Sequence, residues 1–146
     1  MRSAESSICV DANLVIRLLI ETSDTRLTDL WTGWRTEHRT LVAPSLLHFE
    51  VANGLHQYAA GGHRSAKDMA YLLTVALQLP INVVDDDDLH AEAMAMAARV
   101  GISSVYDAHY LALAARLGIE FWTLDKRLHN AIRHHLPWVR FVPIDQ

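Results

Sequence analysis

The chain has 146 residues, 51% of them hydrophobic and 21% charged, with a formal net charge of −4; this excludes a disordered or fibrous protein and indicates a globular domain. Its only cysteine, Cys9, excludes an internal disulfide and a cysteine-rich zinc site and favours a reducing, cytoplasmic compartment. The longest uncharged run, residues 69–84, falls short of the roughly 20 apolar residues that span a bilayer, so no membrane association is expected.

The first half of the chain predicts alternating strands and helices, from the spacing of its apolar residues. In order, these are a strand at 7–10, a helix after Asp11, an amphipathic helix at 24–37, a strand at 41–43, a helix that Pro44 and Ser45 open and Gly61 ends, and a helix at 65–78.

The second half continues this alternation. In order, it predicts a strand at 81–84, a helix led by four aspartates and ended by Gly101, an apolar helix from Ser104 to Gly118, a strand at 120–124, a helix at 125–135 and a strand at 138–142. Strands that alternate with helices indicate an α/β fold with a mainly parallel sheet of four to five strands, covered on both faces. No linker or repeat interrupts the pattern, so residues 1–146 are expected to form a single domain.

Four acidic side chains are expected near one edge of this sheet. Asp11 follows the first strand and Asp125 ends the fourth. Asp107 lies in the first turn of the apolar helix, and Glu50 lies about two turns into the helix after the second strand. Ligands of such sheets bind beyond the carboxyl ends of the strands, which makes this edge the predicted site.

Each of these acids also has a purely structural interpretation. Asp11 and Asp125 fit helix N-caps, whose carboxylates accept hydrogen bonds from free backbone N–H groups. Asp107, three residues after Ser104, resembles part of a capping box, and Glu50 fits an exposed position on a helix face.

Clustering these carboxylates requires a positive charge. Two carboxylates about 4 Å apart repel by about 4 kcal/mol at an effective dielectric constant near 20. Oxygen ligands without a cysteine group favour Mg²⁺ or Mn²⁺ over Zn²⁺, and these ions serve phosphate chemistry. Proteins that bind nucleic acid through its phosphates usually have an excess of basic residues, whereas this chain has a negative net charge. Either nucleic acid is not the ligand, or cations such as Arg17, Lys126 and Arg127 act locally.

Four segments resemble the acidic motifs of PIN-domain ribonucleases, most closely those of VapC-type toxins from bacterial toxin–antitoxin pairs. The segments are Val10-Asp11-Ala12-Asn13, Phe49-Glu50-Val51-Ala52-Asn53, Tyr106-Asp107-Ala108-His109-Tyr110-Leu111-Ala112-Leu113-Ala114 and Thr123-Leu124-Asp125-Lys126-Arg127-Leu128. They follow the family's order, and the resemblance extends from about residue 8 to residue 142.

This resemblance implies an α/β/α sandwich whose acidic pocket binds Mg²⁺ or Mn²⁺ and cuts RNA. The implied catalytic and metal-binding residues are Asp11, Glu50, Asp107 and Asp125, with Asn13 and Thr123 in supporting positions beside the pocket. The resemblance also implies a homodimer and an antitoxin protein that occupies a groove of the early helices. Trp31 and Trp34 are expected in the core, with lining of that groove as the alternative.

Other polar features have simpler interpretations. The run Asp85 to Asp88 lacks the spacing of a calcium loop and is interpreted as negative charge at a helix start. Among nine histidines only His134 and His135 cluster in the sequence, and a solvated surface is expected for them. Arg17 and Lys126 are candidates for phosphate contact.

Two other functions remain open at this stage. A haloacid-dehalogenase-like phosphatase would use Asp11 as nucleophile. Such sites require a second aspartate two positions later, where this chain has Asn13. The other alternative is a non-catalytic PIN module that serves as a scaffold.

Overall fold

The centre of the fold is a five-stranded sheet whose neighbouring strands are all parallel, in the computed structural model that describes residues 7–23 and 25–143. The strand order is β3-β2-β1-β4-β5. The strands are β1 Ser7–Val10, β2 Thr40–Pro44, β3 Ile81–Val84, β4 Glu120–Thr123 and β5 Val139–Phe141. The predicted parallel sheet is thus confirmed, and all five predicted strands are present.

Seven helices connect or follow these strands in the described ranges. They are α1 Ala12–Ile20, α2 Thr25–Thr36, α3 Leu46–Ala60, α4 Ala66–Gln78, α5 Asp88–Val100, α6 Val105–Leu117 and α7 Lys126–Ile132. The helix predicted at 125–135 was too long, because the backbone leaves the helix after Ile132 and turns before Pro137. Asp24, the first residue of the helix predicted at 24–37, lies outside the described residues.

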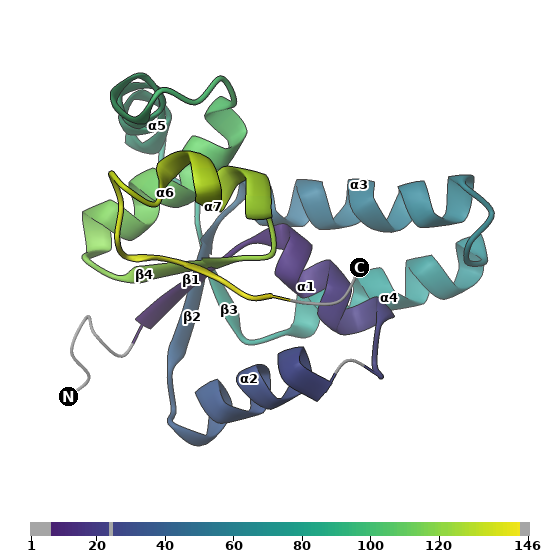
Figure 1. Ribbon diagram of the computed structural model, residues 1–146. Helices are drawn as coiled ribbons and strands as arrows, with labels where there is room; N and C mark the ends of the chain where they lie inside the picture. The colour runs from purple at the N-terminus through teal and green to yellow at the C-terminus, as the bar shows by residue number, and fades with distance from the viewer. Residues whose placement is uncertain (1–6, 24, 144–146) are drawn as a thin grey trace.

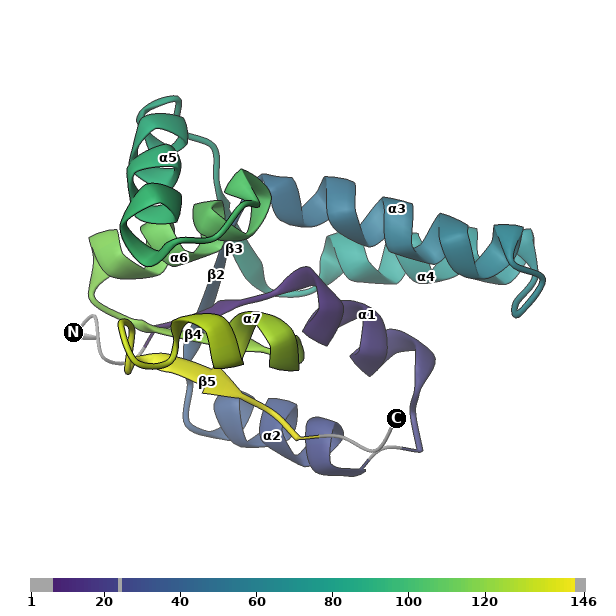
Figure 2. The same ribbon diagram turned by 45° about the horizontal axis from the view of Figure 1, so that its top comes forward.

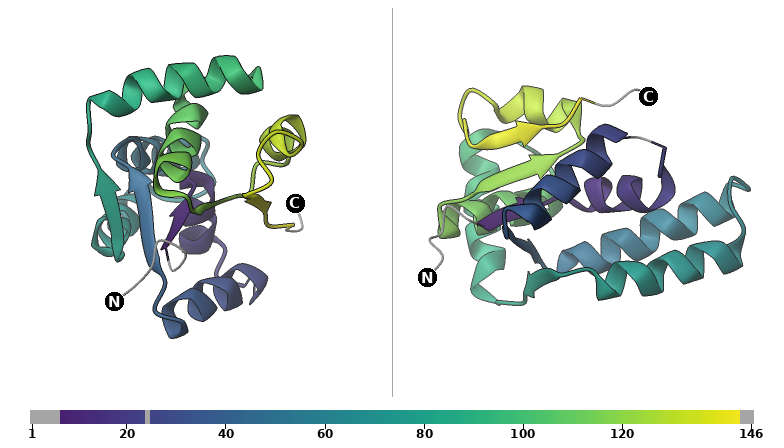
Figure 3. Two further views of the ribbon diagram at one scale, coloured as in Figure 1. Left: turned by 90° about the vertical axis from the view of Figure 1, so that its left-hand side faces the viewer. Right: turned by 90° about the horizontal axis from the view of Figure 1, so that it is seen from below.

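The helices form a layer on each face of the sheet. On one face α6 packs on β1, β2 and β4, with α7 beside it on β5 and α5 stacked against α6, as the left panel of Figure 3 shows. On the other face lie α1 and α2 (Figure 1). The Trp34 ring of α2 is buried 5.4 Å from the Trp122 ring of β4, which confirms the core interpretation of Trp34.

The pair α3 and α4 extends beyond the carboxyl edge of the sheet. Figure 2 shows the two helices running side by side away from the strands, with α1 beside them. Helix α3 approaches α1 closely at Gly54, where an added Cβ would lie 2.5 Å from Ile16 Cδ1. No helix in the described part of the chain has the length and apolar character needed to cross a membrane.

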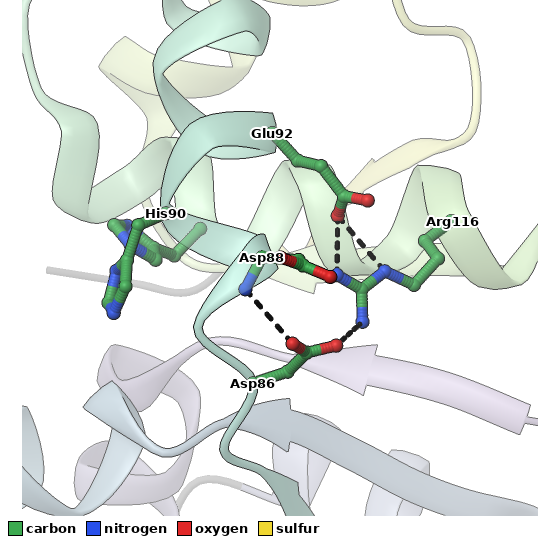
Figure 4. Close-up of polar contacts among 6 residues, drawn as sticks. Asp86, Asp88, His90, Glu92 and Arg116 are labelled. Atoms are coloured by element: carbon green, nitrogen blue, oxygen red, sulfur yellow. Dashed lines mark hydrogen bonds and ion pairs between the residues drawn. The ribbon is translucent and has the colours of Figure 1, made fainter.

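Ionic contacts connect the start of α5 to α6. Arg116 of α6 donates to Asp86 at 2.7 Å and to Glu92 at 2.6 Å, and Asp86 also accepts the backbone N–H of Asp88 at 3.0 Å (Figure 4). Asp86 therefore serves the helix start, as the interpretation of the aspartate run expected.

Candidate active site

Asp11 lies directly after β1 and is the most buried of the four acids. Its side chain is 7% exposed. Oδ1 accepts the backbone N–H of Ala12 at 2.8 Å, and Oδ2 accepts the hydroxyl of Thr123 at 2.7 Å. Asp11 is thus the N-cap of α1, as its structural interpretation expected. It also presents a carboxylate at the carboxyl edge of the sheet.

Thr123 connects Asp11 to the other strand end. Its Oγ1 accepts hydrogen bonds from Asn13 Nδ2 at 3.3 Å and from the backbone N–H of Asp125 at 3.0 Å. Asn13 Oδ1 in turn accepts the backbone N–H of Leu124 at 3.2 Å. Because Thr123 is fully buried, this network sets the relative positions of the ends of β1 and β4.

Glu50 is half-buried, so its interpretation as an exposed helix-face residue was wrong. Its Oε1 accepts the hydroxyl of Tyr110 at 2.7 Å. Tyr110, on α6, is 1% exposed, and its ring centroid lies 5.6 Å from that of Phe121. Burial and the nearby carboxylates of Asp11 and Glu50 raise the pKa of Tyr110 well above its usual value, so the phenol stays protonated and donates.

Tyr110 lies in the motif around Asp107, and the sequence alone predicts no role for it. One signal was available: a tyrosine in an almost wholly apolar, buried helix needs a partner for its hydroxyl. That signal does not identify the partner, which comes from a different helix.

The acids act on one another electrostatically. Burial, together with the charges of Glu50 and Asp107, raises the pKa of Asp11 to about 7, although the hydrogen bonds from Thr123 and Ala12 act to lower it. Burial, then the charges of Asp125 and Glu50, raise the pKa of Asp107. The charges of Glu50 and Asp107 thus act on Asp11, and those of Asp125 and Glu50 act on Asp107.

Asp107 lies in the first turn of α6, and Asp125 is the N-cap of α7. The backbone N–H of Asp107 donates to Ser104 Oγ at 3.4 Å, which is half of the expected capping box. Asp125 caps α7 by accepting the backbone N–H of Leu128 at 3.0 Å. Capping and clustering are thus compatible at both positions.

The donor set suits a hard divalent cation. In residues 7–23 and 25–143, no group of three or more His, Cys, Asp or Glu side chains is arranged so that it holds a metal ion by itself. Mg²⁺ is usually held by only one or two carboxylates, with waters and substrate phosphates completing its coordination. Asp11, buried with a raised pKa beside other acids, is a carboxylate that a cation would stabilise in its charged form.

Positive side chains lie close to this edge. A pocket of about 710 Å³ between α1 and α3 is lined by Asn13, Arg17, Gln57 and Leu124, among others. Lys126 is exposed and follows Asp125 directly. Of the two cations predicted to contact phosphate, Arg17 thus lines a pocket together with Asn13, and Lys126 is the chain neighbour of Asp125.

The sequence interpretation missed one histidine contact. His90 Nδ1 of α5 lies 2.8 Å from His109 Nε2 of α6, although only His134 and His135 were expected to cluster. The two histidines lie on different helices and nineteen residues apart in the chain, so sequence spacing does not show the contact.

Comparisons with known proteins agree with this architecture. Residues 8–133 match the model of the PIN domain family. Ribonuclease VapC3 of Pyrobaculum aerophilum is 28% identical over 123 residues, which cover 83% of this chain and 91% of that protein. The structure of VapBC2 from Rickettsia felis, bound to a promoter DNA fragment, superposes with a TM-score of 0.69 at 10% identity and covers 95% of this chain and 99% of that one.

A second solved structure has the same fold. VapC20 of Mycobacterium tuberculosis, a sarcin-ricin-loop-cleaving toxin, superposes with a TM-score of 0.64 at 18% identity, covering 85% of this chain and 94% of that one. The family match spans most of the chain and all four acidic segments. The chain therefore belongs to the PIN domain family.

Proposed function

We propose that this protein is a metal-dependent endoribonuclease that hydrolyses RNA phosphodiester bonds. The observation that carries the proposal is the buried Asp11 carboxylate at the end of β1, on which the charges of Glu50 and Asp107 act and whose pKa is raised to about 7. A ribonuclease among its relatives and an RNA-cleaving toxin among proteins of the same fold support it.

The acids would hold the ion, and other residues would position them. Asp11, Glu50, Asp107 and Asp125 are the residues proposed to hold Mg²⁺ or Mn²⁺, either directly or through the waters that the ion keeps. The bound ion supplies positive charge that activates water and neutralises the charge growing on the phosphoryl group. Thr123 holds Asp11 and Tyr110 holds Glu50, each through a 2.7 Å hydrogen bond. Arg17 and Lys126 would bind the flanking phosphates.

A cleavage assay tests the proposal. The purified chain should cut single-stranded RNA with Mg²⁺ or Mn²⁺ and lose this activity with a chelator. Asp107→Asn should lose at least about 100-fold in rate, in line with the loss of other electrostatic stabilisers of a transition state. Asp29→Asn, at an exposed position on α2, is the matched control and should keep the wild-type rate. Undiminished cutting by folded Asp107→Asn would refute the assignment.

We also propose that the protein is the toxin of a type II toxin–antitoxin pair, acting as a homodimer. A solved VapBC2 complex and a Klebsiella pneumoniae toxin–antitoxin complex, the latter at a TM-score of 0.62, share the fold. Co-expression with the product of the neighbouring reading frame should give one complex in size-exclusion chromatography and should suppress RNA cleavage. A neighbour that neither binds nor inhibits would contradict this.

The two alternatives have less support. A phosphatase that used Asp11 as nucleophile would need a second aspartate two positions later, where Asn13 instead bonds to Thr123 and to the backbone of Leu124. Phosphate trapped covalently on Asp11 would nevertheless establish that chemistry. A scaffold without catalysis would show no divalent-ion binding by calorimetry.

A further inference from the structure

A second pocket, of about 240 Å³, lies at the carboxyl ends of β2 and β3. It is lined by Pro44, Phe49, Leu89, His90, Tyr106 and His109, among others. Pockets that take a whole small-molecule ligand usually measure roughly 300–1,000 Å³, so this one suits a fragment such as a single ring system.

This pocket adjoins the acidic site. Phe49 directly precedes Glu50 on α3, and Tyr106 directly precedes Asp107 on α6. The pocket lies over β2 and β3, whereas Asp11 follows β1, the neighbour of β2. Neighbouring strands are about 4.8 Å apart, so the two sites are separated by about one to two strand spacings. A base attached to a nucleotide next to the scissile phosphate reaches that far.

Two aromatic side chains at the pocket are left open to solvent. Phe49 is 72% exposed and Tyr106 is 67% exposed. An exposed aromatic beside a proposed RNA-cleaving site offers a face on which an unstacked base can stack, which is how proteins commonly hold single-stranded RNA.

The polar groups of the pocket include two histidines and the carboxylate of Asp85, which accepts the hydroxyl of Ser45 at 3.5 Å. His109 Nδ1 lies 2.6 Å from the carbonyl oxygen of Val105, which only accepts, so Nδ1 carries the proton. His109 Nε2 lies 2.8 Å from His90 Nδ1, so these two ring nitrogens contact each other. Asp85 also lines the pocket and is exposed, whereas Asp86 is bound to Arg116 (Figure 4).

We propose that this pocket binds one unstacked base of the RNA beside the scissile phosphate, stacked on Phe49 and Tyr106. The inference rests on the proposed ribonuclease function and adds a determinant of its sequence preference. The carboxylate of Asp85 matches a base edge that donates hydrogen bonds. Guanine, which presents adjacent N1–H and N2–H donors, is the best-matched base.

Binding measurements test the pocket without requiring cleavage. Fluorescence anisotropy in Ca²⁺ buffer would measure the Kd of a short single-stranded RNA, with an abasic site placed at each position in turn. Phe49→Ala and Tyr106→Ala should each weaken binding about 5- to 150-fold, the range for loss of one base–aromatic stack. Tyr71→Ala removes an equally exposed tyrosine, 67%, from α4 and should bind as wild type does.

Two further comparisons identify the base. One abasic position should weaken wild-type binding and leave Phe49→Ala unaffected, and Phe49→Tyr should restore the wild-type pattern. Replacing guanine by inosine, which lacks the N2 amine, should weaken binding by wild type but not by Asp85→Asn. Equal Kd values for Phe49→Ala, Tyr106→Ala and wild type would refute the proposed base-binding role of the pocket, even if the protein cuts RNA. If the base-dependent pattern is found in a protein that cuts no RNA, only the proposed nuclease function is refuted. If the protein binds no RNA, both the nuclease proposal and the base-binding proposal are refuted.

Discussion

Thr123 is the residue on which the geometry of the acidic site most depends. It donates to Asp11 and accepts from Asn13 and from the backbone of Asp125. Thr123→Val keeps the shape but removes a donor to a carboxylate, so we expect a loss of about 1.5–3 kcal/mol in the free energy of unfolding. Urea denaturation measures this value.

Thr123→Ser separates the hydroxyl from the methyl group. It keeps the three hydrogen bonds and should lose about 0.5–1.5 kcal/mol, as for one buried methyl group, while retaining RNA cleavage. Equal losses of cleavage in the valine and serine variants would mean that packing by the methyl group, and not the hydroxyl, orients Asp11.

Asp11 makes the stability of the metal-free protein depend on pH. Its folded pKa of about 7 lies above the roughly 3.9 of an unfolded aspartate. The folded state therefore binds more protons between these values, and its stability falls as pH rises from about 4 to about 7, by at most about 4 kcal/mol.

The stability of the Asp11→Asn variant should not fall with rising pH in this way. Any constant cost of fitting an amide beside Thr123 does not change with pH. The difference in unfolding free energy, variant minus wild type, should therefore rise with pH across this window in chelator-treated samples. A flat difference would show that Asp11 titrates normally.

At the scale of elements, two glycines should respond to alanine substitution in opposite ways. Gly118 ends α6 with a φ of +66°, a left-handed conformation that costs other residues about 1–2 kcal/mol. Gly33 lies inside α2 with open space around its Cβ position. Gly118→Ala should lower the free energy of unfolding by about 1 kcal/mol or more, and Gly33→Ala should raise it by about 0.5–1 kcal/mol.

Thermal or urea unfolding of both variants measures these changes. Because neither glycine touches the acids, RNA cleavage should be unchanged in both. A stabilised Gly118→Ala protein would mean that α6 ends differently from the structure.

At the scale of the whole molecule, metal binding should couple to stability. An ion that binds only the folded state adds about 2.7 kcal/mol at one hundred times its dissociation constant. Because the ion requires ionised carboxylates, the rise in Tm with Mn²⁺ should be larger at pH 8 than at pH 5. Asp107→Asn should reduce this rise, whereas Asp29→Asn should leave it unchanged; a rise independent of pH would argue against carboxylate ligands.

The sequence by itself determined the strands, most helix bounds, the parallel sheet and the family. These follow from local periodicity and from motifs whose residues are neighbours in the chain, such as the strand at 7–10 followed by Asp11. The placement of Asp11 and Asp125 at one edge also followed, because both come directly after strands of one parallel sheet.

Only the tertiary structure decided which side chains meet across elements. Tyr110 bonds to Glu50 across sixty residues, and His90 contacts His109 across two helices. The pocket between Phe49 and Tyr106 likewise depends on where α3 and α6 begin relative to the sheet. Such contacts are set by the packing of helices on a common sheet, and a periodic pattern fixes which face a residue occupies but not which partner it faces.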